Sequence, residues 1–372
     1  MRTNAPRRVI AVLTASLLPL VAAPVVAAET VARTQTPPAS SASCGRQSES
    51  MRIGVSPGAS IGGLSPADLD RELTLAKDAG SFSVRLDIDW SAIEPTRGSF
   101  DWSRTDRVID AVVAHGMCPL GIIAYTPRWA RVASAVNDSH SRPANPANFA
   151  AFAKTVVQRY QNRIKIWEVW NEPNIVTFFK PAPDVTAYSA LLKATYNAIK
   201  QVQPGATVLS GGMAPAEDTN GNISGTTFLS RMYSQGSNKY FDAFNVHPYT
   251  WPYLPNDPST ASWNSAMKMW PMRDTMVAGG DSAKQIWITE FGAPTGTAPN
   301  SVSEQVQSDS IGIVLDAVLG NAWLGPAFVY SLRDAGTDTS DTEQNFGMLH
   351  RDWTPKPAYG RVDAYAAEHS GP

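Results

Sequence analysis

The chain has 372 residues, of which 43% are hydrophobic and 17% are charged, and its formal net charge is −2. This composition is ordinary for a globular protein and provides enough apolar material for one large domain or two small ones. No block of basic residues follows the first few positions, so we expect neither nucleic acid nor an anionic membrane as a partner.

Residues 1–28 have the features of an export signal peptide. Arg2, Arg7 and Arg8 precede an apolar stretch over 9–23, and small residues at 26–28 form a cleavage signal. Arg7-Arg8 leaves a twin-arginine route open. The apolar stretch is shorter than the roughly 20 residues that cross a bilayer. We therefore expect no transmembrane segment and a protein that is secreted or associated with the cell envelope.

Residues 29–50 are rich in Ser, Thr, Ala and Pro and contain almost no large apolar side chain. Such a segment cannot bury a core, so it predicts a flexible tether, and residues 51–372 are the expected folded domain. The two cysteines, Cys44 and Cys118, could pair in an exported protein. A buried free Cys118 is the other possibility that the sequence leaves open.

Short apolar runs alternate with longer segments of helical spacing along the expected domain. The strand candidates are 53–57, 82–88, 118–123, 164–170, 206–210, 242–247, 285–290 and 326–331. The helix candidates are 66–79, 103–115, 146–160, 184–203, 226–234, 262–278, 302–320 and 356–367. Ser65-Pro66 and Asn145-Pro146 fit helix starts. Eight strand-helix repeats predict an α/β fold, a (β/α)8 TIM barrel, with a doubly wound open sheet as the alternative.

Polar and aromatic side chains follow the predicted strands, where the functional residues of such a barrel lie. They are Arg85 and Asp87 after the second strand, Tyr125 and Trp129 after the third, Asn171 and Glu172 after the fourth, His247 and Tyr249 after the sixth, Glu290 after the seventh, and Tyr330 with 331–334 after the eighth. We expect these side chains to meet at one end of the barrel.

The stretch KIWEVWNEPN, residues 165–174, places two glutamates in an apolar run. Strand alternation gives Glu168, Trp170 and Glu172 the same facing, with Glu168 deeper in the barrel. A carboxylate at that depth must be paired, and Arg85 is the expected partner. Glu172 lies at the rim, where a ligand can reach it, so we expect chemistry from Glu172 and an ion pair from Glu168.

A second rim carboxylate comes from QIWITEFGAP, in which Glu290 ends an apolar strand. A lone glutamate at a strand end would simply meet water. Two such glutamates in a closed barrel face each other across its mouth, and a pair about 5–5.5 Å apart performs retaining glycoside hydrolysis. Their pKa values would then differ, the proton donor being raised and the nucleophile staying ionised.

IWEVWNEPN together with IWITEFGAP resembles the retaining glycoside hydrolases of clan A over residues 51–368. AYTPRWA, VYSLRD and FGMLHRDWTPKPAY are most similar to family 39, and family 5 is next. Many members carry Trp at the end of the eighth strand, where this chain has Tyr330 or Arg333-Asp334. Many family 5 members also carry a His after the third strand, where this chain has Tyr125.

The resemblance implies roles for several residues. Glu172 would be the acid/base, Glu290 the nucleophile, and Asn171 the group that binds the sugar 2-hydroxyl. Arg85 would brace the nucleophile, and His247 and Tyr249 match the polar and aromatic pair of the sixth strand. Arg85 and a hydrogen bond from Tyr249 would also favour an ionised Glu290.

The remaining aromatic residues are further candidates for substrate binding. Tyr125 and Tyr330 are expected at the mouth. Trp129, Trp251, Tyr253 and Trp263 lie in or near loops there, where flat rings stack on sugars. Ordinary packing explains any single Trp equally well.

Other motifs point to other chemistry. GASIG, residues 58–62, has the pattern of serine hydrolases around Ser60. The histidines lack metal-site spacing and no nucleotide motif occurs, so we expect no metal and no cofactor.

The sequence therefore predicts an exported, monomeric retaining glycosidase that cleaves β-linked cell-wall or matrix polysaccharide or oligosaccharide. A non-catalytic carbohydrate-binding barrel is the alternative, followed by a serine esterase.

Overall fold

We describe the protein from a computed structural model that places Cys44 and residues 53–369, all within one compact unit, 38–372. The predicted signal peptide and, apart from Cys44, the predicted tether lie outside the described residues. Within 53–369, none of the helices combines the length and apolar character that a membrane span requires.

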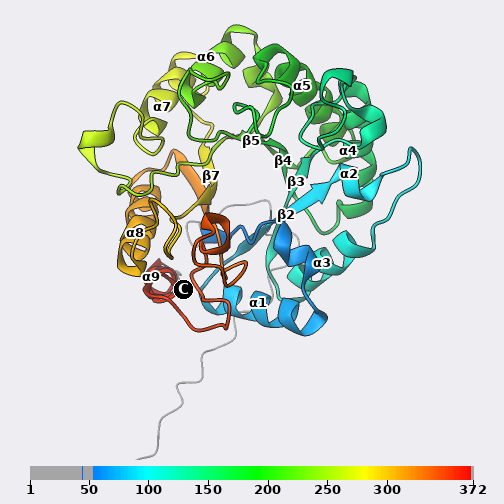
Figure 1. The fold of residues 1–372 in the computed structure, drawn as a ribbon. Helices are drawn as coiled ribbons and strands as arrows, with labels where there is room; N and C mark the ends of the chain where they lie inside the picture. The colour runs from blue at the N-terminus through cyan, green and yellow to red at the C-terminus, as the bar shows by residue number, and fades with distance from the viewer. Residues whose placement is uncertain (1–43, 45–52, 370–372) are drawn as a thin grey trace, which may run out of the picture. The chain divides into compact units, whose positions relative to one another are not determined.

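Eight parallel strands form the centre of the fold, and the helices surround them (Figure 1). The strands are β1 Ile53–Val55, β2 Ser83–Asp89, β3 Cys118–Ala124, β4 Ile166–Asn171, β5 Thr207–Gly212, β6 Phe244–Val246, β7 Ile286–Phe291 and β8 Leu324–Val329. β1 pairs with both β2 and β8. Single bridges, Leu209 to Ala243 and Met213 to Val246, join β5 to β6 and close the ring. The predicted TIM barrel is confirmed, and the open sheet is excluded.

The helices follow the predicted segments, except that a short helix over 90–93 was not predicted. They are α1 Pro66–Asp78, α2 Trp90–Ile93, α3 Ser103–Ala114, α4 Pro146–Tyr160, α5 Val185–Val202, α6 Gly225–Ser234, α7 Met269–Ala278, α8 Glu304–Gly320 and α9 Pro357–His369. The side chains of Ser65 and Asn145 cap α1 and α4, as their Pro-containing starts predict. The helix predicted over 262–278 begins seven residues late. The side chain of Asn264 donates to the Pro255 carbonyl and accepts from the Met267 N–H, and these bonds hold the segment in turns.

The barrel interior changes from apolar to charged along its axis. Six buried side chains fill its lower part, namely Leu120, Ile166, Leu209, Ala243, Trp287 and Phe328. In the strand register, Leu120 lies beside Arg85 and Leu209 beside Glu168. The polar layer therefore lies directly on a floor of packed hydrophobic side chains. This floor keeps the charged groups in a rigid environment with little water.

A disulfide joins Cys44 to Cys118, whose Cα atoms lie 5.5 Å apart. Cys118 is the first residue of β3. The bridge therefore lies at the end of the barrel where the strands begin, and the possibility of a free Cys118 is excluded.

Candidate active site

A cleft of about 560 Å³ opens where the strands end. Most of the predicted site residues line it: Arg85, Tyr125, Asn171, Glu172, Tyr249, Glu290 and Tyr330. His247 is fully buried beside them. Trp129 is not among the lining residues; its ring packs edge-on against Trp90 and its indole nitrogen donates to the Glu94 carbonyl.

Glu172 and Glu290 approach each other across this cleft. One carboxylate oxygen of each, together with a ring nitrogen of His247, lies within 4.8 Å of the others. Glu172 is 7% exposed, and the Glu290 side chain is 15% exposed. Both carboxylates are thus shielded from bulk water yet open to a ligand, as the sequence predicts from their positions at the ends of β4 and β7.

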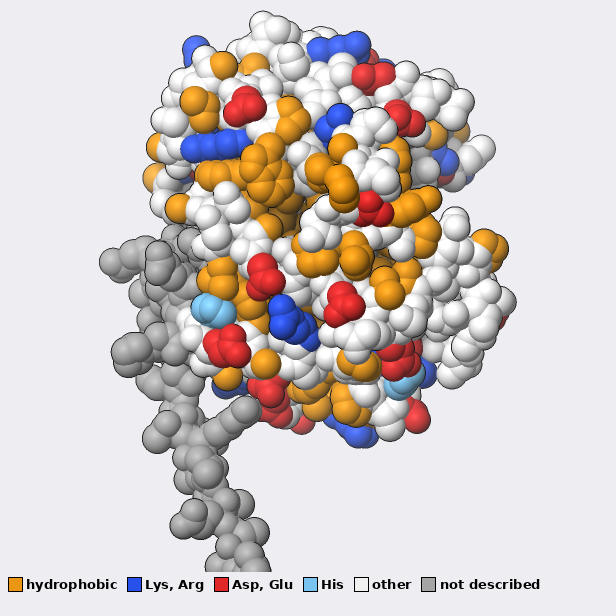
Figure 2. Space-filling model, turned by 90° about the vertical axis from the view of Figure 1, so that its left-hand side faces the viewer, with side chains coloured by type: hydrophobic (Ala, Val, Ile, Leu, Met, Phe, Trp, Pro, Cys, Tyr) orange, Lys and Arg blue, Asp and Glu red, His pale blue; other side chains and the backbone are white. Residues whose placement is uncertain are grey.

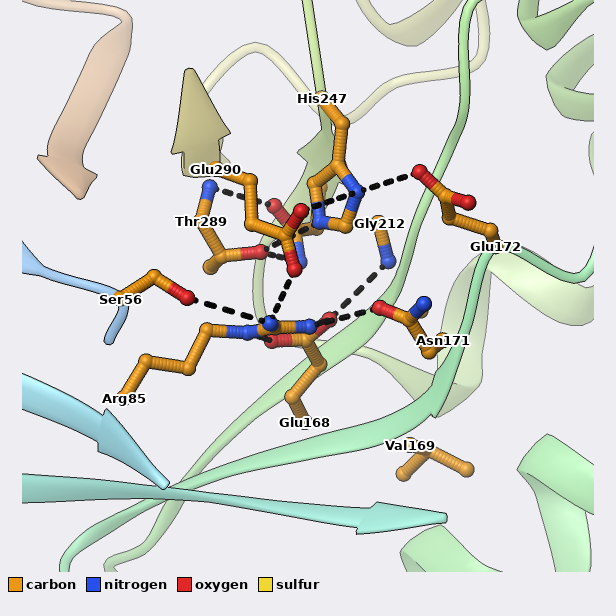
Figure 3. A network of polar contacts seen from close by, with 12 residues as sticks. Ser56, Arg85, Glu168, Val169, Asn171, Glu172, Gly212, His247, Thr289 and Glu290 are labelled. Carbon is orange, nitrogen blue, oxygen red and sulfur yellow. Dashed lines mark hydrogen bonds and ion pairs between the residues drawn. The ribbon is translucent and has the colours of Figure 1, made fainter. Parts of the chain in front are cut away.

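Arg85 on β2 joins the floor of the cleft to its rim (Figure 3). Its guanidinium donates two hydrogen bonds to Glu168, at 2.8 and 2.9 Å, and a third to Asn171 at 2.9 Å. A further bond of 2.5 Å reaches Glu290. The predicted ion pair of Glu168 is therefore present, and the bidentate geometry fixes the plane of the guanidinium that contacts Glu290.

Glu290 is held in its ionised form. The Tyr249 hydroxyl donates to its second oxygen at 2.9 Å. Burial alone would raise the pKa of Glu290, but the positive charges of His247 and Arg85 and the Tyr249 hydrogen bond together hold it below its ordinary value. A carboxylate in this state is available as a nucleophile.

Glu172 has the opposite environment. Its nearest polar partner is His247, whose Nδ1 lies 2.9 Å from one carboxylate oxygen. Burial raises the pKa of Glu172 despite this contact, and the negative charge of Glu290 adds to the rise. The pKa values of the two carboxyl groups are thus moved in opposite directions, as an acid and a nucleophile would require.

His247 is positioned from below by residues that the sequence pattern did not identify. Its Nε2 lies 3.0 Å from the hydroxyl of Thr289, which also accepts a 2.7 Å hydrogen bond from the Asn245 amide. The register of β7 against β8 is irregular between Ile288 and Phe291. This irregularity brings both Thr289 and Glu290 to His247, whereas simple alternation would send one of them outward.

The end of β4 also departs from strand alternation. Trp170 and Glu172 have positive φ angles, 72° and 46°. Trp170 packs against Phe149 of α4 and against Phe179, and its indole nitrogen donates to the Phe178 carbonyl. The prediction that Trp170 faces the same way as Glu168 is therefore wrong: the unusual backbone turns Trp170 outward and presents Asn171 and Glu172 to the cleft.

Two further carboxylates line the cleft, Asp87 on β2 and Glu343 after β8. Glu343 accepts a hydrogen bond from the Tyr330 hydroxyl at 3.4 Å. No motif surrounds Glu343, so only the path of the loop after β8 reveals its position. Asp87 follows Arg85 at the spacing of one strand face, and this spacing is the signal that identifies it.

Glu172, His247 and Glu290 form a possible metal-binding group by distance alone. The contacts of these residues disfavour a bound metal ion, because Arg85 and Tyr249 already donate hydrogen bonds to Glu290 and His247 contacts Glu172. The arrangement suits proton transfer better than metal coordination.

Ser60 lacks the partners of a hydrolase nucleophile. It is exposed in a short 3-10 helix, Ala59–Gly63, and its hydroxyl donates to the Pro57 carbonyl at 3.1 Å. Within residues 53–369, no histidine is within hydrogen-bonding distance of it, so GASIG is a structural loop.

Comparison with known proteins gives one family match and many similar structures. The sequence model of glycosyl hydrolase family 10 matches residues 57–177, a segment that includes Asn171 and Glu172. A family 39 glycoside hydrolase from Bacteroides cellulosilyticus WH2 has a TM-score of 0.65 at 23% identity, with 86% of this chain and 64% of that chain covered. This chain therefore spans just under two thirds of that structure.

Two other structures extend the comparison. A monomeric beta-xylosidase from Caulobacter crescentus CB15 has a TM-score of 0.63 at 17% identity, covering 84% of this chain and 67% of that one. A GH5_18 structure from Streptomyces cattleya, in complex with GlcNAc, has a TM-score of 0.64 at 16% identity, covering 86% and 81%. Likeness at this identity establishes the fold. The family 10 match over residues 57–177 and the structures of families 39 and 5 are similarities to clan A glycoside hydrolases.

Proposed function

We propose that the protein is a retaining glycoside hydrolase that cleaves β-glycosidic bonds by double displacement. The observation that carries this proposal is the pair of facing carboxylates, Glu172 and Glu290, with oxygens within 4.8 Å and pKa values moved in opposite directions. This spacing fits a nucleophile that attacks the sugar directly, since an inverting pair needs room for a water molecule between the carboxyl groups.

In the first step, Glu290 attacks the anomeric carbon and forms a covalent glycosyl ester. Glu172 gives its proton to the leaving oxygen as the glycosidic bond breaks. Arg85 and Tyr249 hold Glu290 in place through both of its oxygens. Asn171 accepts from Arg85 through its side-chain oxygen, which fixes the amide so that its nitrogen faces the sugar 2-hydroxyl.

In the second step, Glu172 acts as a base. It takes a proton from water, and the resulting hydroxide attacks the anomeric carbon and releases Glu290 as a carboxylate. His247 contacts Glu172 from the side and holds it at the same place in both steps, since a carboxyl group that exchanges roles must not move between them.

The substrate that we propose is a cell-wall or matrix polysaccharide or oligosaccharide. The predicted export signal and tether support a protein that is secreted or associated with the cell envelope, and we propose a monomer because one similar structure is that of a monomeric beta-xylosidase. Similar folds include a beta-xylosidase and an exo-beta-1,4-mannosidase from Opitutaceae bacterium strain TAV5. The fold does not fix the sugar, so a panel of wall polysaccharides with product analysis is the direct approach.

Three variants test the assignment. Glu290→Gln should reduce turnover by orders of magnitude, and Glu172→Gln should reduce it most on substrates with poor leaving groups, which need the proton. Glu343→Gln is the matched control, because Glu343 lines the same cleft without contacting either glutamate through a hydrogen bond. Near-normal rates in the first two variants would refute the mechanism. A folded wild type that binds polysaccharide but hydrolyses no glycoside would favour the non-catalytic barrel.

A further inference from the structure

The segment between β6 and α7 runs from the cleft to the outside of the barrel (yellow-green in Figure 1). Trp251 lines the cleft. Two residues further on, Tyr253 is 46% exposed, and two residues of chain span at most about 7 Å. Tyr253 therefore stands directly outside the cleft, on the same segment.

Tyr253 forms an aromatic pair with Trp263, which we call the outer aromatic pair. Their ring centroids are 5.6 Å apart and their planes meet at 69°. Tyr253 donates its backbone N–H to the Thr250 carbonyl at 3.0 Å, and the Thr250 hydroxyl returns a 3.0 Å bond to the Tyr253 carbonyl. Asn264 donates to the Pro255 carbonyl at 3.1 Å. These bonds hold the backbone of the loop, and the contact between the half-buried Trp263 and the exposed Tyr253 orients the two rings, which lowers the entropy lost on binding.

A second cavity of about 260 Å³ adjoins the outer aromatic pair. Trp263 lines it together with polar side chains that include Glu217, Asp218 and Lys268. The loop after β5 connects this cavity to the cleft, because residues 214–215 line the cleft and residues 216–218 line the cavity. An aromatic face beside hydrogen-bonding groups is the combination that holds a sugar ring.

We propose that Tyr253, Trp263 and the adjoining cavity form a second sugar-binding subsite. It would hold the part of a β-linked glycan that extends beyond the glycosidic bond to be cleaved, which lies between Glu172 and Glu290. This inference rests on the proposed function, because it names where the rest of the substrate lies. It implies that the protein acts on chains longer than the cleft itself accommodates.

The test measures binding separately from catalysis. Affinity gel electrophoresis is run in barley β-glucan, birchwood xylan, galactomannan and arabinogalactan. At least one polysaccharide should retard the wild type, and Tyr253→Ala and Trp263→Ala should each weaken this retardation about tenfold, the loss expected from one stacked ring. Trp263→Phe keeps a flat ring and should retain most of the affinity.

Trp270 offers a matched control. It is also 46% exposed and forms an aromatic pair with Trp323, which directly precedes β8 and so lies at the far end of the barrel. Its helix, α7, is on the side of the barrel shown in Figure 2, where hydrophobic side chains lie among charged ones. Trp270→Ala should leave retardation unchanged.

Hydrolysis of 4-nitrophenyl monoglycosides should stay within twofold in the Tyr253 and Trp263 variants, because neither residue lines the cleft. No retardation of the wild type, or equal retardation in wild type and variants, would overturn the inference. If Trp263→Ala does not fold, the exposed Tyr253→Ala decides alone. A retarded wild type that hydrolyses nothing would refute the proposed function while leaving the subsite supported.

Discussion

The Asp87 carboxylate should destabilise the folded protein at neutral pH. Burial raises the pKa of Asp87 to about 6 against the opposing attraction of Arg85, and the negative charge of Glu290 adds to the rise. Among the described residues, no group donates a hydrogen bond to this carboxylate. Its ionised form in the folded protein is therefore poorly compensated.

The size of this effect follows from the shift in pKa. The pKa rises from 3.8 to about 6, and a shift of about two units corresponds to about 3 kcal/mol. Partial access of water to the cleft reduces this value, so Asp87→Asn should raise the free energy of unfolding by about 1–3 kcal/mol. Because the folded pKa is the higher one, the destabilisation is absent below about pH 4, grows as pH rises, and is complete above about pH 6.

Thermal unfolding at pH 4.5 and pH 7.5 measures this effect. Asp87→Asn should raise Tm by about 2–6 °C at pH 7.5 and by clearly less at pH 4.5. Asp89→Asn is the control on the same strand: Asp89 accepts hydrogen bonds from the backbone of Ser91 and Ala92, and Asn caps a helix about as well as Asp, so Tm should change little at either pH. An unchanged or lower Tm for Asp87→Asn at pH 7.5, or a gain independent of pH, would refute the reasoning.

Three further predictions concern activity, stability and specificity. The rate should fall on both sides of a pH optimum, because Glu290 with its lowered pKa must be ionised and Glu172 with its raised pKa must be protonated. In Glu172→Gln, the pH profile of kcat/KM on activated aryl glycosides should no longer fall at alkaline pH. Cys118→Ser should lower the free energy of unfolding by up to about 4 kcal/mol, from the sequence separation of 74, while kcat stays within twofold; an equal Tm with and without reductant in the wild type would contradict this. β-Glucuronides should react at least tenfold more slowly than matching neutral glycosides. The reason is that the cleft lining holds four carboxyl groups and a single guanidinium, which is already paired with two glutamates. Equal rates on paired 4-nitrophenyl substrates would contradict this prediction.

The sequence was sufficient to predict the barrel and the two carboxylates, since these depend on short-range patterns. Apolar runs of strand length and capped helix starts repeat in order, and Glu172 and Glu290 each end such a run. The partner of Glu168 also follows from burial, because a deep carboxylate needs a cation and Arg85 occupies the matching level on β2.

Features that depend on irregular backbone were not predictable in this way. Positive φ at Trp170 breaks strand alternation, and the shifted register of β7 brings Thr289 to His247. The cleft position of Glu343 depends on the path of a loop, and the pairing of Cys44 with Cys118 depends on distance in three dimensions. Periodicity carries no information about these features.

The covalent intermediate on Glu290 is the central claim, and trapping it is the most direct test. The protein is incubated with a 2-deoxy-2-fluoro glycosyl fluoride of the sugar that it hydrolyses, then digested, and the labelled peptide is identified by mass spectrometry. The mechanism predicts one sugar per chain, attached to Glu290, with turnover lost in proportion to labelling. A label on another residue, or no label together with products of inverted anomeric configuration, would contradict it.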